Sequence, residues 1–171
     1  RELHLDVLSF ERGLRAALRV DPDVIMVGEM RDYDTMNAAV SAAETGHLVF
    51  ASLHTNNAAQ TIERIVNTFP PAQQAQIIIQ LANTISGIIS QRLIPRIRGG
   101  LIPATEVLIA TTAVRNLVRE GKTQQLNLVI ETGADVGMVT MNKSLADLVR
   151  RREISMEQAE FYSLNPNELK T

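Results

Sequence analysis

The sequence predicts an α/β fold with a parallel sheet, because two short apolar runs alternate with helical patterns. The runs cover residues 24–27 and 48–53, and β-branched or aromatic residues are frequent in both. Such runs are typical of strands buried on both faces of a parallel sheet. Glu29 follows the first run and His54 the second. Because chemistry in these folds lies beyond the carboxyl ends of the strands, we expect the two side chains to share a site.

A helix is expected before each run. Ser9 fits the N-cap of the first helix, which should end near Val20. Asp34 fits the N-cap of the second, and Gly46 stands where a glycine often follows a helix. These signals enclose the first strand between two helices.

Two more helices are expected after the second run. The first has an apolar face over residues 62–69 and stops at Pro70. The second starts with Pro71 at its first position and continues to about Arg92.

The pattern changes after Arg92. The segment Arg98-Gly99-Gly100 indicates a hairpin turn between residues 92–97 and 101–109. Short helices follow, the first capped by Thr111 or Thr112. We therefore expect an α/β region over residues 1–110 and a small helical region over residues 111–171.

Composition excludes several classes of protein. The chain has 171 residues, 45% of them hydrophobic, a formal net charge of −2 and no cysteine. This content argues against a disordered chain, a disulfide scaffold, a thiol enzyme and a cysteine-ligated zinc protein. Three scattered histidines predict no metal centre, and the near-neutral charge gives no overall attraction to nucleic acid. The sequence favours a soluble cytoplasmic protein without a transmembrane segment.

Glu29 is the candidate catalytic carboxylate. Nucleoside triphosphatases place an acidic residue at a strand end beside the γ-phosphate, where it orients water or holds Mg²⁺ through water. A strand that ends in a solvated glutamate gives the same pattern, and this simpler interpretation is favoured while the motif is taken alone.

His47 and His54 stand at opposite ends of the second run. A straight strand of this length would separate them by about 23 Å, so one metal ion is not shared between them. His54 is a candidate for the same site as Glu29, whereas a structural role is the default for His47.

A phosphate-binding loop is missing from these residues. No G-x-x-x-x-G-K-[ST] segment occurs, and the one Gly-Lys pair, Gly121-Lys122, has Asn116 where the motif needs glycine. The sequence thus has part of a nucleotide site without the phosphate cradle.

Several segments resemble the type II/type IV secretion ATPase superfamily. Residues 18–32 are similar to its Walker B region, residues 45–56 to its histidine box, and residues 89–93 to the conserved stretch that follows. Within it, residues 113–122 and the short cysteine-free connection 93–103 are most similar to the type IV pilus retraction ATPases.

This resemblance implies a RecA-like P-loop ATPase core that works as a ring of six identical subunits with ATP and Mg²⁺. It implies that Glu29 polarises the attacking water and that His54 senses the γ-phosphate, with His47 in the same box near the nucleotide. It also implies a set of arginines near subunit contacts or phosphate: Arg1, Arg15, Arg19 and Arg31.

The resemblance further implies that the C-terminal helices couple hydrolysis to pilus retraction, and so to twitching motility. The matching signature residues are Arg115, Asn116, Arg119 and Glu120. The implied partner is an inner-membrane platform protein, which would hold the motor peripherally at the cytoplasmic face. Taken without the resemblance, these helices are interpreted more simply as a cap on the sheet.

The family's phosphate loop and N-terminal domain are expected upstream of Arg1, in a protein roughly twice as long. We therefore interpret the chain as a C-terminal piece that does not hydrolyse ATP by itself. Two alternatives remain open: a pilus assembly or type II secretion ATPase, and a binding or oligomerisation module without hydrolysis.

Overall fold

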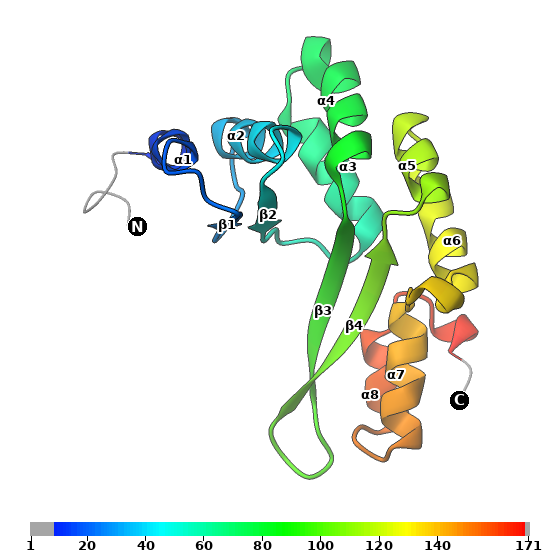
Figure 1. Cartoon of the computed structure of the whole chain (residues 1–171). Coiled ribbons are helices and arrows are strands. Elements are labelled where there is room, and N and C mark those ends of the chain that lie inside the picture. Colours follow the sequence, from blue (N-terminus) through cyan, green and yellow to red (C-terminus); the bar gives the residue numbers. More distant parts are fainter. Residues whose placement is uncertain (1–8, 170–171) are drawn as a thin grey trace. The chain divides into compact units, whose positions relative to one another are not determined.

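The computed structural model describes residues 9–169, which divide into two compact units. The first unit contains the chain up to His54 together with Ile62–Ile85, and the second contains Thr55–Thr61 and everything from Ser86 on. The elements are labelled in Figure 1. The division expected after residue 110 stays a prediction.

The first unit is built around a pair of parallel strands, as predicted. Strand β1 pairs with β2 in a register that places Val24 opposite Leu48 and Val27 opposite Ala51, and α2 connects them. The elements are α1 (Phe10–Leu18), β1 (Val24–Val27), α2 (Tyr33–Glu44), β2 (Leu48–Ala51), the part of α3 (Ala58–Thr68) from Ile62 on, and α4 (Pro71–Thr84). The α/β class predicted from the sequence is confirmed.

The expectation that these strands are buried on both faces is wrong for the described residues. Ile25 and Val27 are buried, but Met26 between them is 69% exposed, and Phe50 on β2 is 54% exposed. Side chains alternate across a strand, and α2 packs against β2 within this unit. One face of the strand pair is therefore covered by the described chain and the other is not.

Helix boundaries follow local capping chemistry. The Ser9 side chain caps α1 and Pro71 occupies the first turn of α4, both as predicted. The N-cap of α2 is Asp32 rather than Asp34, because the Asp32 carboxylate accepts hydrogen bonds from the backbone N–H and hydroxyl of Thr35. Gly46 has φ +95°, the left-handed conformation that the sequence predicts after α2.

The long helix expected from Pro71 to about Arg92 ends at Thr84, and this prediction is wrong. Residues Gly87–Pro95 form strand β3, which pairs antiparallel with β4 (Leu101–Ile109). A Cβ atom at Gly87 would lie 2.9 Å from the Leu108 carbonyl oxygen, so this close approach needs glycine. Polar Ser90 and Arg92 face the same side as Ile94, which hid the alternating pattern of a strand.

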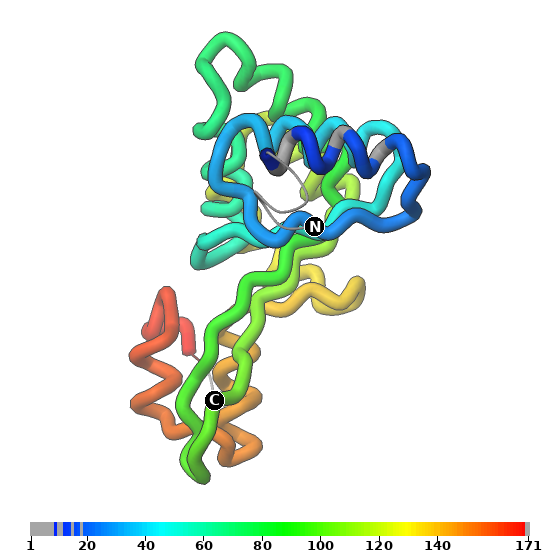
Figure 2. Tube along the Cα trace, turned by 90° about the vertical axis from the view of Figure 1, so that its left-hand side faces the viewer, coloured from blue at the N-terminus to red at the C-terminus, as the bar shows by residue number. Residues whose placement is uncertain are grey.

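The second unit is a hairpin covered by short helices. Figure 2 shows β3 and β4 running side by side. The helices are α5 (Thr112–Arg119), α6 (Leu126–Thr132), α7 (Met141–Arg150) and α8 (Met156–Tyr162). A buried cluster joins the hairpin to α7 and α8: Ile94, Ala104, Met141, Leu145, Leu148, Ile154, Ala159 and Leu169. Among residues 9–169, no helix has the length and apolar character needed to cross a membrane.

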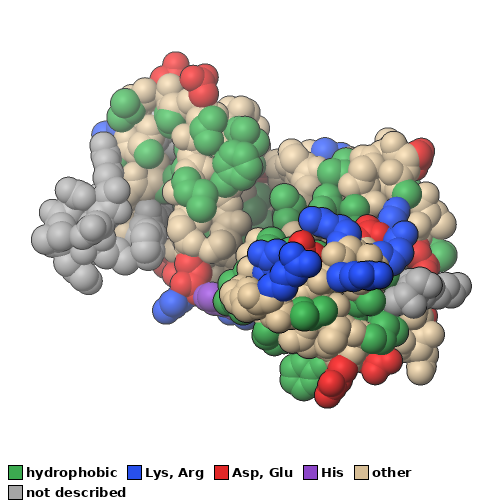
Figure 3. All heavy atoms as spheres, turned by 90° about the horizontal axis from the view of Figure 1, so that it is seen from below, with side chains coloured by type: hydrophobic (Ala, Val, Ile, Leu, Met, Phe, Trp, Pro, Cys, Tyr) green, Lys and Arg blue, Asp and Glu red, His purple; other side chains and the backbone are tan. Residues whose placement is uncertain are grey.

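The turn of the hairpin is bound to the connection between α7 and α8 by an ion pair and a hydrogen bond. The Arg96 guanidinium lies 2.5 Å from the Glu153 carboxylate, and the Ile97 N–H donates to the Glu153 carbonyl at 2.9 Å. Exposed arginines flank this contact at Arg98 and at residues 150–152. Figure 3 shows Lys and Arg side chains gathered on this face. This end of the second unit is therefore basic.

Candidate functional site

The carboxyl ends of β1 and β2 are tied together by backbone and side-chain hydrogen bonds. The Met30 N–H donates to the Ser52 carbonyl oxygen at 3.0 Å, and the Ser52 hydroxyl donates to the Gly28 carbonyl oxygen. These contacts bring the segment that carries Glu29 alongside the segment that leads to His54.

Glu29, Arg31 and His54 form a continuous cluster at this edge. One carboxylate oxygen of Glu29 lies 2.6 Å from Arg31 Nη2, and the other lies 2.8 Å from His54 Nε2. The Glu29 side chain is 24% exposed, whereas the Arg31 and His54 side chains are 74% and 76% exposed. The carboxylate is thus half-buried, with two nitrogen donors presented to solvent around it.

The neighbours of Glu29 favour its ionised form. The hydrogen bond and positive charge of Arg31 lower the pKa of Glu29, His54 lowers it further, and partial burial opposes them. The pKa of Arg31 is raised in return by the hydrogen bond and charge of Glu29. A lowered pKa makes Glu29 a weak proton acceptor that stays negative at neutral pH. That character suits a group that orients water more than one that removes a proton.

Two supporting residues in this site were missed from the sequence. Arg64, on α3, donates to the His54 carbonyl oxygen at 3.1 Å and so holds the backbone of the histidine. Ser52 lies inside the predicted strand, but in the structure it links the two strand ends. Its polar side chain in an otherwise apolar run was the available signal; Arg64 gave none, because one exposed arginine on a helix resembles any other.

His47 lies at the amino end of β2 and takes no part in the cluster. Its Nδ1 atom lies 3.0 Å from the Ala42 carbonyl oxygen and 3.1 Å from the Thr45 hydroxyl. These partners belong to the end of α2, so in this chain His47 fixes the turn between α2 and β2.

The four candidate arginines lie in different parts of the chain. Arg31 lies in the cluster with Glu29. Arg19 is the exposed C-cap of α1. The Arg15 side chain and all of Arg1 lie outside the described residues.

The C-terminal signature residues lie on α5 and just after it. Arg115 is half-buried and its Nε donates to the Ala110 carbonyl oxygen, while exposed Arg119 bonds Asn116 at 2.8 Å. Glu120 pairs with Lys122 at 2.7 Å, and this contact lowers the pKa of Glu120. Val114 and Val118 on the same helix are buried. The helix therefore packs through its valines and presents polar side chains outward.

No group of three or more His, Cys, Asp or Glu side chains within residues 9–169 is arranged to hold a metal ion. Both oxygens of Glu29 already face nitrogen donors.

Comparison with known proteins places the chain in a family. The model described as "Type II/IV secretion system protein" matches residues 6–162. The chain belongs to the type II/IV secretion system protein family. A type IV pilus retraction ATPase, PilT of Pseudomonas aeruginosa, is 49% identical over 93% of the chain and 46% of its own length. A twitching motility protein of Neisseria gonorrhoeae is 50% identical over 93% of the chain and 43% of its own length.

Among solved structures of this family, the pilus retraction motor PilT with bound ADP matches with a TM-score of 0.90 and 51% identity. The match covers 99% of the chain and 48% of that structure. The chain thus spans slightly less than half the length of these members of the type II/IV secretion system protein family.

Proposed function

We propose that this chain is part of an ATP-hydrolysing motor subunit that drives type IV pilus retraction, with ATP as its substrate. The observation that carries the proposal is the Glu29 carboxylate, held at the end of β1 between Arg31 and His54. Similarity to the retraction ATPase, to the twitching motility protein and to the ADP-bound motor supports it.

In this proposal Glu29 acts as the catalytic glutamate. Its negative charge orients the water that attacks the γ-phosphate, and proton removal contributes little because phosphoryl transfer depends mainly on positioning and electrostatics. Arg31 keeps Glu29 ionised and aimed, and His54 donates from Nε2 toward the same space. Mg²⁺ that arrives with ATP would neutralise phosphate charge.

The assembly we propose is a ring of six identical subunits at the cytoplasmic face of the inner membrane, in contact with a platform protein of the pilus. Arg1, Arg15 and Arg19 are proposed to lie near contacts between subunits. His47 is proposed to contribute to the nucleotide site only if a neighbouring subunit brings that site to it.

The direct test is Mg²⁺-dependent ATP hydrolysis by the full-length protein and by the purified 171-residue chain, side by side. We expect turnover from the full-length protein and none above background from the chain, because the chain has no phosphate-binding loop. Hydrolysis by the chain at a rate near that of the full-length protein would contradict this prediction. Absence of hydrolysis in both would instead favour a binding or oligomerisation module.

We also propose that the signature on α5 couples hydrolysis to retraction. Replacing Arg115 or Arg119 with alanine in the full-length protein should abolish retraction in cells while ATP turnover of the purified protein falls less than about threefold, since neither residue belongs to the Glu29 cluster. The measurement pairs a twitching assay with a turnover assay at equal protein levels. Retraction that survives both substitutions would show that α5 is only a packed cover.

A further inference from the structure

Glu106 is a carboxylate inside the second unit that the site described above does not use. It stands on β4 opposite Ser90 of β3, and only 6% of its surface is exposed. No other acidic or basic side chain among the described residues is buried. Burying a carboxylate is costly unless it is hydrogen-bonded, so its partner indicates what it does.

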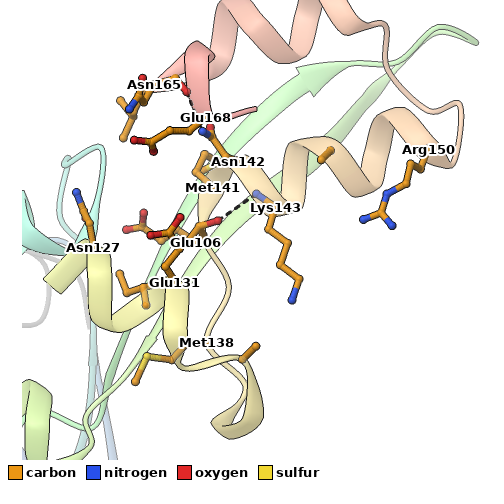
Figure 4. Close-up of a pocket in the computed structure, with 15 residues that line it drawn as sticks. Glu106, Asn127, Glu131, Met138, Met141, Asn142, Lys143, Arg150, Asn165 and Glu168 are labelled. Atoms are coloured by element: carbon orange, nitrogen blue, oxygen red, sulfur yellow. Dashed lines mark hydrogen bonds between the residues drawn. The ribbon is translucent and has the colours of Figure 1, made fainter. Parts of the chain in front are cut away.

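Glu106 lies in the wall of a cavity of about 320 Å³. Figure 4 shows it near Glu131, while the side chains of Lys143 and Arg150 extend away from it. Burial raises the pKa of Glu106, against smaller opposing effects of the Ala58 N–H, Arg92 and Ser90. The cavity therefore offers little positive charge to this carboxylate, and its hydrogen bond to the backbone becomes the main candidate for a role.

That hydrogen bond caps the start of α3. Glu106 Oε1 accepts from the backbone N–H of Ala58 at 2.8 Å, and Ala58 is the first residue of the helix and fully buried. The amide groups in a first helical turn have no partner within the helix and carry partial positive charge, which a carboxylate satisfies. Asn57 adds a second cap, because its side chain accepts from the Gln60 N–H at 2.8 Å.

Helix α3 also holds His54 of the candidate site. Arg64, six residues after Ala58 on the same helix, donates to the His54 carbonyl oxygen at 3.1 Å. The hydroxyls of Thr55 and Thr61 lie 2.7 Å apart, and this hydrogen bond joins the residue after His54 to the first turn of α3. Since α3 is a continuous helix, a shift of its first turn displaces Arg64 and with it the backbone of His54.

We propose that Glu106 is a positioning residue for His54, acting through the first turn of α3. The proposal rests on the proposed function of His54 at the nucleotide site. The feature that matters is a hydrogen-bond acceptor at this place, because the partner of Glu106 is a neutral backbone N–H.

The test uses three variants of the full-length protein. Glu106→Ala removes the acceptor, Glu106→Gln keeps an acceptor oxygen on a side chain of the same shape, and Glu168→Ala is the matched control. Glu168 also lines the cavity, but its side chain is exposed and lies outside α3. The three measurements are amide hydrogen exchange of the peptide covering residues 55–61, the NMR signals of the His54 imidazole, and kcat beside the Kd for ADP.

We expect Glu106→Ala to speed exchange in residues 55–61 by about tenfold or more, the usual effect of losing such a bond. It should shift the His54 signals and lower kcat by about tenfold, with the Kd for ADP changed less than threefold. Glu106→Gln and Glu168→Ala should stay near the wild type in all three measurements.

Three results would overturn the proposal: unchanged exchange in Glu106→Ala, faster exchange with unchanged His54 signals, or a glutamine variant as impaired as the alanine one. If the wild type hydrolyses no ATP, the proposed function fails, while exchange and the His54 signals still decide the role of Glu106.

Discussion

Replacing Glu29 with glutamine in the full-length protein should lower ATP turnover by about a hundredfold or more, the usual size of the contribution of a polar group preorganised at the reacting centre. Glutamine has the same shape, so the change removes the negative charge and little else. Without that charge, the attacking water keeps only a weaker, neutral acceptor to orient it, and Arg31 loses its ionic partner at 2.6 Å. The measurement is steady-state phosphate release at saturating Mg²⁺ and ATP.

Asp34→Asn is the matched control for this experiment. Asp34 is an exposed acid in the first turn of α2, in the same unit as Glu29 and outside the cluster. We expect its loss to change turnover less than threefold, because exposed charges in a first helical turn stabilise by under about 1 kcal/mol. A Glu29→Gln variant whose turnover stays within about threefold of the wild type would remove Glu29 from the catalytic role.

The sequence was sufficient to predict which side chains meet wherever local patterns and strand geometry agree. Parallel strands bring their carboxyl ends to one edge, so Glu29 and His54 were expected to meet, and they do at 2.8 Å. The role of Arg31 as the partner of Glu29 did not follow from its position, because a charged loop residue has many possible orientations. Only the fold of residues 28–32 selects one.

The sequence does not predict structure that depends on hydrogen bonds to residues far away in the chain. The helix expected to reach Arg92 ends at Thr84 because residues 87–95 pair with β4, a contact invisible to helical periodicity. Glu106 is a lone glutamate inside the apolar run 101–109, which is an unusual feature, but the run itself does not indicate its partner. Its partner, the N–H of Ala58, lies 48 positions earlier in the chain, and no local spacing links the two.

The two histidines that flank the second strand provide the other large expected effect, because each uses a different ring nitrogen. His54 contacts Glu29 through Nε2, and His47 contacts the Ala42 carbonyl oxygen through Nδ1. The amide of asparagine can replace Nδ1, while the longer glutamine side chain can replace Nε2. A pair of substitutions at each position therefore distinguishes a role at the nucleotide site from a role in the turn.

In the full-length protein, His54→Asn should lower turnover by about a hundredfold to a thousandfold, the range seen when a donor to developing charge is lost. His54→Gln should retain more activity, because it still reaches Glu29.

His47→Asn should fold and turn over ATP nearly as the wild type does. His47→Gln should lower the free energy of unfolding by about 1 kcal/mol through the lost bond to Ala42. Turnover by each variant and its urea denaturation midpoint are the two measurements. If His47→Asn lost as much turnover as His54→Asn while its stability stayed normal, the contacts within this chain would not explain the role of His47. Its imidazole would then have to act at a nucleotide site of a neighbouring subunit.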